Sequence, residues 1–93
     1  MSAHDGPADA SAAWERADGR LRRVVIATSY ADAISTVVRL GLLFEDHGHH
    51  ADLALSWTEL TIELISHDTG GVTDRDHAMA HRIDDVLETA PVT

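Results

Sequence analysis

The segment from Glu45 to His67 carries histidines at both of its ends, and this arrangement restricts how the chain can fold. His47, His49 and His50 open the segment, and His67 closes it after a run in which apolar and polar residues alternate. These four imidazoles can converge if the segment folds back on itself. Because histidine gives and takes protons readily near neutral pH, the segment has the composition of a proton-transfer site.

Length and charge indicate one small domain and disfavour several classes of partner. A chain of 93 residues buries only about two thirds of its unfolded surface, so its core is modest and oligomerisation would bury more. Seven arginines, no lysine and sixteen acidic residues give a net charge of −9, which argues against nucleic acid and anionic membrane surfaces. With no cysteine, no apolar run of membrane-spanning length and no signal-peptide pattern, the expected location is cytoplasmic.

The first part of the chain predicts a mobile segment followed by a β-hairpin. Residues 1–13 are small and polar, so we expect them to be mobile and place a single domain over residues 14–90. Asp18-Gly19 is typical of a hairpin turn, because both residues tolerate a positive φ. Strands are therefore predicted near 14–17 and 20–28. Three arginines in the second strand favour an edge strand or one that faces a partner.

A helix follows, with signals for both of its ends. Ser29 and Asp32 form a capping-box-like pair, and Gly48 accepts the left-handed conformation that ends many helices, so the helix is predicted to run to about Asp46. We expect it to be largely buried, because its apolar residues recur at helical spacing. The apolar face comprises Tyr30, Ile34, Val37, Val38 and Gly41, widened by Leu40, Leu42, Leu43 and Phe44.

The second half predicts a strand pair and another helix. Apolar residues alternate from Leu60 to Leu64, which is typical of a half-buried strand, and the apolar residues around Leu53 begin a preceding strand. Thr73 and Asp76 form a capping box, so a helix is predicted over about 74–88. Strand pairs interleaved with helices predict an α+β domain whose antiparallel sheet is covered on one face.

The order and spacing of several residues from Glu45 onward resemble the pterin-4a-carbinolamine dehydratases. In that family an acidic or basic residue is followed by a His-His pair, an aromatic residue, a histidine and an aspartate at set distances. The matching residues are Glu45, His49, His50, Trp57, His67 and Asp76. The resemblance covers roughly residues 14–87. It departs from the family where Ala51 replaces a proline, and where the segment before Trp14 is shorter than the family's first helix.

This resemblance implies a four-stranded antiparallel sheet with helices packed on one face, and a hairpin turn at Thr58-Glu59. Because subunits of the family pair through the sheet, a homodimer or homotetramer is expected. The family's reaction is the dehydration of 4a-hydroxytetrahydropterin (4a-hydroxytetrahydrobiopterin) to quinonoid dihydropterin, in the recycling of the pterin cofactor. The pterin is the substrate of this hydro-lyase, and no further cofactor and no metal is expected.

The resemblance also implies which residues form the site. His49, His50 and His67 are the expected catalytic residues, since imidazoles suit both proton transfers of a dehydration. The acid and the base among them are left open. Asp68 could either orient an imidazole or bind the amino-pyrimidine edge of the pterin. The expected substrate-binding residues are Gly48, His49, His50, Ile65, Ser66, His67 and Asp68.

Two other functions are compatible with the sequence. The negative end of a helix dipole favours a solvated pair such as His49-His50 without any catalysis, and the same fold serves in non-catalytic binding, assembly or dimerisation factors. A small histidine-rich metal-binding protein is the third hypothesis, because His77 and His81 lie one helical turn apart. No further ligand completes such a site by motif, so these two are interpreted as helix-surface residues.

Four further residues have structural interpretations. Asp76 is interpreted as a helix cap rather than a catalyst, and Trp57 is assigned a supporting role in the core or at an interface. His47 lies off the family pattern and is expected to be exposed. Glu45 either holds a histidine or ends its helix, and both alternatives remain open.

Overall fold

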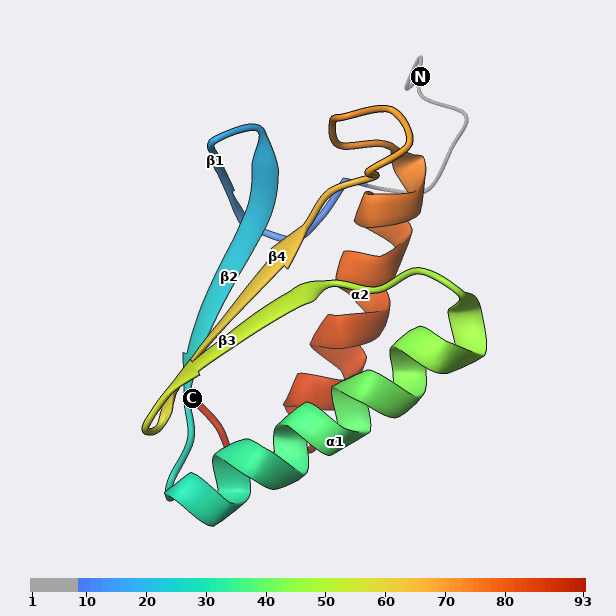
Figure 1. Cartoon of the computed structure of the whole chain (residues 1–93). Helices are drawn as coiled ribbons and strands as arrows, with labels where there is room; N and C mark the ends of the chain where they lie inside the picture. Colours follow the sequence, from blue (N-terminus) through green and yellow to red (C-terminus); the bar gives the residue numbers. More distant parts are fainter. Residues whose placement is uncertain (1–8) are drawn as a thin grey trace.

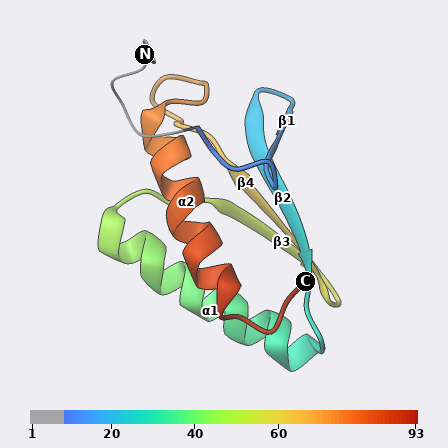
Figure 2. The same cartoon turned by 180° about the vertical axis from the view of Figure 1, so that it is seen from behind.

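In the computed structural model, residues 9–93 are described, and they form an antiparallel sheet with two helices on one of its faces (Figures 1 and 2). The elements are β1 Glu15–Ala17, β2 Arg20–Ile26, α1 Tyr30–His47, β3 Asp52–Ser56, β4 Glu59–Leu64 and α2 Asp74–Glu88. The strand order is β1-β2-β4-β3, and all neighbours are antiparallel. The predicted α+β fold is confirmed. Neither helix of the described part is long and apolar enough to cross a membrane.

The core lies between the sheet and the helices, and strand β4 supplies its centre. Leu60, Ile62 and Leu64 are at most 1% exposed, because successive side chains of a strand point to opposite faces and these three point toward the helices. Leu40 of α1 and Ile83 of α2 are fully buried in the same cluster. This packing fixes where β4 ends, and the loop that follows β4 carries part of the candidate site.

Helix α1 begins and ends as expected but buries a different face. The Asp32 amide donates to the Ser29 hydroxyl at 3.1 Å, and Gly48 ends the helix with a φ of 62°. This helix has apolar residues on two of its sides, and both sets recur at helical spacing. Periodicity alone therefore could not decide which side faces the sheet. Thr36 is tolerated inside because its hydroxyl donates to the Asp32 carbonyl oxygen at 2.8 Å. The buried residues are Ala33, Thr36, Leu40 and Phe44, whereas Tyr30, Ile34, Val38 and Leu42 are 41–64% exposed.

Strand β2 lies inside the sheet, between β1 and β4, so the predicted edge position is wrong. Its arginines are compatible with an internal strand because each guanidinium bonds to a carboxylate on another element. The pairs are Arg20 with Asp52, Arg22 with Glu63 and Arg23 with Asp84. The edges of the sheet are β1 and β3. That a face or edge of this sheet meets a second subunit stays a prediction.

The hairpin between β3 and β4 turns at Trp57-Thr58, one residue earlier than the resemblance implied. Ser56 pairs with Glu59, which leaves a loop of these two residues. Trp57 adopts a positive φ of 51° and is 76% exposed. Because the turn directs its indole into solvent, Trp57 does not support the core, and that part of its interpretation is wrong.

Residues just before β1 are held against α2. The Ala10 amide donates to Nδ1 of His77 at 3.0 Å, and Nε2 of His81 lies 2.8 Å from the Asp9 carbonyl oxygen. Both histidines have intermediate exposure on α2, which agrees with their interpretation as helix-surface residues. The segment predicted to be mobile was residues 1–13, of which residues 1–8 lie outside the described residues.

Candidate active site

A cavity of about 450 Å³ opens where the end of α1, the start of β3, the loop after β4 and the start of α2 meet. All of the predicted substrate-binding residues except Ile65 line it. The lining residues are Gly48, His49, His50, Asp52, Ser66, His67, Asp68 and Arg75. The chain therefore does fold back so that His49 and His50 share one cavity with His67. Their catalytic roles stay predictions.

Gly48 sets the direction in which the His-His pair leaves α1. Its left-handed backbone, with a φ of 62°, ends the helix and turns the chain toward β3. His50 remains largely exposed, and its Nε2 lies 3.1 Å from the Glu45 carboxylate. The His50 ring also lies 6.2 Å, centroid to centroid, from the ring of Phe44. Of the two alternatives for Glu45, the structure favours holding a histidine, since α1 continues past it to His47.

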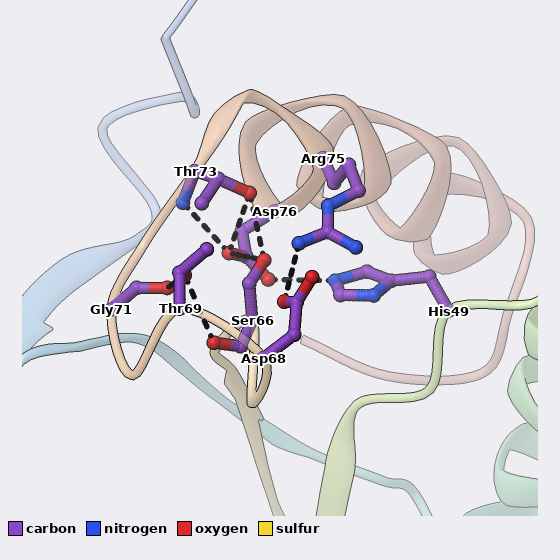
Figure 3. A network of polar contacts seen from close by, with 8 residues as sticks. All are labelled: His49, Ser66, Asp68, Thr69, Gly71, Thr73, Arg75 and Asp76. Atoms are coloured by element: carbon purple, nitrogen blue, oxygen red, sulfur yellow. Dashed lines mark hydrogen bonds and ion pairs between the residues drawn. The ribbon is translucent and has the colours of Figure 1, made fainter.

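Asp76 is the buried centre of the polar network in Figure 3. Its carboxylate accepts hydrogen bonds from His49 Nε2 at 2.7 Å, Ser66 Oγ at 2.8 Å and the Thr73 amide at 2.9 Å. Burial raises the pKa of Asp76, but these hydrogen bonds outweigh it and hold the pKa below the ordinary 3.8. Asp76 thus caps α2, as predicted, and also holds a histidine at the cavity, which sequence reasoning missed.

This contact determines which nitrogen of His49 carries hydrogen. An ionised carboxylate only accepts hydrogen bonds, so Nε2 of His49 must be the donor toward Asp76. In the neutral ring Nδ1 then has a free lone pair, and Figure 3 shows Nδ1 turned away from Asp76. A neutral imidazole held in this way keeps Nδ1 as its only acceptor for a proton.

The loop after β4 presents His67 and Asp68 at the cavity. It closes on itself because the Ser66 amide donates to the Gly71 carbonyl oxygen at 3.0 Å, while Gly70 adopts a φ of 72°. His67 is exposed at the cavity. Asp68 pairs with Arg75 at 2.6 Å, and this hydrogen bond lowers the pKa of Asp68. Asp68 therefore bonds to a guanidinium rather than to an imidazole, and its contact with the pterin stays a prediction.

Two residues that line the cavity, Asp52 and Arg75, and one buried behind it, Asp76, were not expected to take part. Asp76 had a sequence signal, since it belongs to the family pattern, but its spacing from Thr73 was fully explained by a helix cap. Arg75 is the basic position of the family-like run that ends at Asp76 but had been given no role, and Asp52 had no signal, because only the folded chain brings these residues to one cavity. Within residues 9–93 no three histidine or acidic side chains come together in a way that could hold a metal ion.

The sequence comparisons agree with the resemblance inferred from the motif spacing. The family model described as pterin 4 alpha carbinolamine dehydratase matches residues 4–86. A protein from Mycobacterium sp. (strain KMS), named only provisionally as a pterin-4-alpha-carbinolamine dehydratase, is 41% identical over 75 residues, which cover 81% of this chain and 80% of the relative. A protein of the same provisional name from Mycolicibacterium vanbaalenii is 43% identical over 74 residues, which cover 80% of both chains.

Two solved structures share the fold. A transcriptional coactivator/pterin dehydratase from Brucella melitensis superposes with a TM-score of 0.74 at 21% identity, covering 81% of this chain and 82% of that one. A pterin dehydratase-like protein identified as a RuBisCO assembly factor in the alpha-carboxysome superposes with a TM-score of 0.67 at 19% identity, covering 89% and 94%. At these identities the likeness establishes the sheet and helix arrangement alone.

Proposed function

This chain belongs to the pterin 4 alpha carbinolamine dehydratase family, and we propose that it catalyses the dehydration of 4a-hydroxytetrahydropterin. In this reaction the bond between C4a and the hydroxyl oxygen breaks, and a proton joins the departing oxygen to give water. The hydrogen on N5 leaves as a proton, and its electron pair forms the C4a–N5 double bond of the quinonoid dihydropterin. The enzyme therefore needs one group that accepts a proton at N5 and one that donates a proton to the oxygen.

The observation that carries this proposal is the hydrogen bond from His49 to the buried Asp76 carboxylate. We assign the N5 proton to His49, because the contact with Asp76 leaves Nδ1 of His49 as a proton acceptor. A base held in one orientation needs no reorganisation during the proton transfer, which is the usual advantage of such a pairing.

The acid that protonates the oxygen is assigned to the pair formed by His50 and His67. Both line the same cavity as His49, so all three can reach one pterin ring. His50 is held by its bond to the Glu45 carboxylate, whereas His67 is presented by the tight loop after β4. The pterin is the substrate, and the proposed steps use only these imidazoles.

Alanine substitutions test this assignment. We expect His49→Ala and His67→Ala each to lower the rate of dehydration by about a hundredfold, the usual scale for one positioned acid or base. The double variant should fall by less than the product, because the two residues serve one reaction. His77→Ala is the matched control, since His77 bonds to Ala10 outside the cavity. Equal rates for His49→Ala and the control would contradict the assignment.

A partner-binding function is the second candidate, and the exposed apolar stripe of α1 favours it. Tyr30, Ile34, Val38 and Leu42 recur every four residues along this helix and are 41–64% exposed. Exposed apolar patches of this kind mark interaction surfaces. If Val38→Glu abolished self-association while dehydration in wild-type protein remained undetectable, the binding function would replace the catalytic one.

A further inference from the structure

A second cavity of about 250 Å³ adjoins the first and is lined by His47, Gly48, His49, Arg75, Ala78, Met79 and Arg82. Three of these residues, Gly48, His49 and Arg75, line both cavities. The two spaces therefore meet along the end of α1 and the first turns of α2. A substituent that reached from the first cavity into the second would pass these three residues.

The second cavity is cationic, although the protein as a whole is acidic. Its lining contains two guanidinium groups and no carboxylate, in a chain whose net charge is −9. Arg75 and Arg82 are seven residues apart on α2, which is two turns, so both lie on the same side of the helix with about 10 Å between their backbones. Ala78 and Met79 lie between them on the helix and line the cavity as well.

Both arginines retain donors for a ligand. Arg82 forms no ion pair with any residue in the described range 9–93. Arg75 bonds to Asp68 through a single nitrogen, Nη2, and a guanidinium has five N–H donors. Paired planar donors of this kind match the oxygens of phosphate and carboxylate groups.

The chemistry of the pterin indicates which substituent reaches this cavity. His49 lines both cavities, and in the proposed reaction it takes the proton from N5. C6, the ring atom bonded to N5, carries the variable side chain of pterins, so this side chain leaves the ring next to His49. We propose that the protein acts on pterins whose C6 side chain ends in an anionic group, which Arg75 and Arg82 bind in the second cavity. This inference rests on the proposed dehydratase function.

Calorimetric binding of three stable pterins tests the inference: neutral 6-hydroxymethylpterin, its phosphate monoester and 6-carboxypterin. We expect the phosphate ester to bind at least about tenfold more tightly than the neutral pterin at low salt, because charge-assisted hydrogen bonds add to ring binding. The preference should shrink as salt rises, since the site is open to solvent. Comparing the two anions then distinguishes a phosphate-bearing substrate from a carboxylate-bearing one.

Matched arginine variants locate the effect. Arg82→Gln should bring the ratio of the anionic to the neutral affinity close to one, and Arg82→Lys should restore most of it. Arg16→Gln makes the same charge change on β1, the sheet edge opposite β3, and should leave the ratio unchanged. Circular dichroism of each variant confirms that it is folded.

The failure of this inference differs from the failure of the proposed function. Equal affinities of wild-type protein for the neutral and anionic pterins would overturn the anionic side-chain preference and leave the dehydratase function standing. A preference for anionic pterins that persists in Arg82→Gln would also overturn the inference, because the anionic group would then bind somewhere other than the second cavity. Wild-type protein that binds none of the three pterins would remove both proposals.

Discussion

Replacing Asp76 by asparagine should change which nitrogen of His49 carries hydrogen. The carboxylate now accepts from His49 at one oxygen and from Ser66 and Thr73 at the other. Asparagine has one acceptor oxygen and one donor nitrogen. If its oxygen keeps the Ser66 and Thr73 bonds, its NH₂ faces His49, so Nε2 must become an acceptor and the hydrogen moves to Nδ1. His49 can then no longer accept a proton at Nδ1.

The expected loss of activity follows from this exchange of hydrogen. We predict that Asp76→Asn lowers the dehydration rate by roughly a hundredfold or more, because a positioned base typically contributes at least this much. The protein should still fold, since the amide oxygen of asparagine can accept the hydrogen bonds from Ser66 and from the Thr73 amide that cap α2. The bond between His49 and a charged carboxylate is replaced by one to a neutral amide, so the free energy of unfolding should fall by about 1 kcal/mol.

The matched control is Asp74→Asn, which removes the same charge from the exposed first turn of α2. Stopped-flow absorbance on freshly generated 4a-hydroxytetrahydropterin gives the rates, and nitrogen-15 NMR of the imidazoles reports which nitrogen of His49 is protonated. A folded Asp76→Asn protein that keeps both the wild-type rate and hydrogen on Nε2 would refute the argument. A loss of rate shared equally by Asp74→Asn would assign the effect to overall charge instead.

Three further predictions follow from the same residues. Because the pKa of Asp76 is lower in the folded protein, its contribution to stability is present above about pH 4 and is lost as pH falls. Denaturant titrations at several pH values should therefore show that the free energy of unfolding falls less steeply with decreasing pH in Asp76→Asn than in wild type. The protein should sediment as a dimer or tetramer at micromolar concentration, since its apolar stripe and sheet edges are exposed; a monomer would contradict this. Untagged protein should carry no stoichiometric zinc, iron or nickel, which elemental analysis after dialysis would measure, and one metal per chain would favour the metal-binding hypothesis.

The parts of the fold that were predictable are those with a single strong local signal. The alternation from Leu60 to Leu64 predicted β4. The capping box at Thr73 and Asp76 predicted the start of α2, and the helix expected over about 74–88 has these bounds in the structure. The buried face of α1 was not predictable, because both sides of this helix are apolar and only packing against the sheet selects one. The arginines of β2 suggested an edge strand because charged residues are usually exposed. Their carboxylate partners lie on other elements, so the local sequence of β2 could not reveal that these charges are paired inside the sheet.

The candidate site was predictable in its histidines but not in what holds them. The spacing of His49, His50 and His67 matched the family pattern, and the folded chain brings all three to one cavity. Asp76 was assigned only one role, although a carboxylate has enough acceptor positions to cap a helix and hold His49 at the same time. Recognising the second role requires the distance between the start of α2 and the end of α1, which sequence spacing does not contain.

The most direct test of the proposed function is the rate of 4a-hydroxytetrahydropterin dehydration with wild-type protein. The measurement compares the spontaneous rate with the rate at several micromolar concentrations of folded protein, at neutral pH. The account predicts that the rate increases in proportion to protein concentration and that quinonoid dihydropterin is the product. A folded, pterin-binding protein that leaves the spontaneous rate unchanged would contradict it.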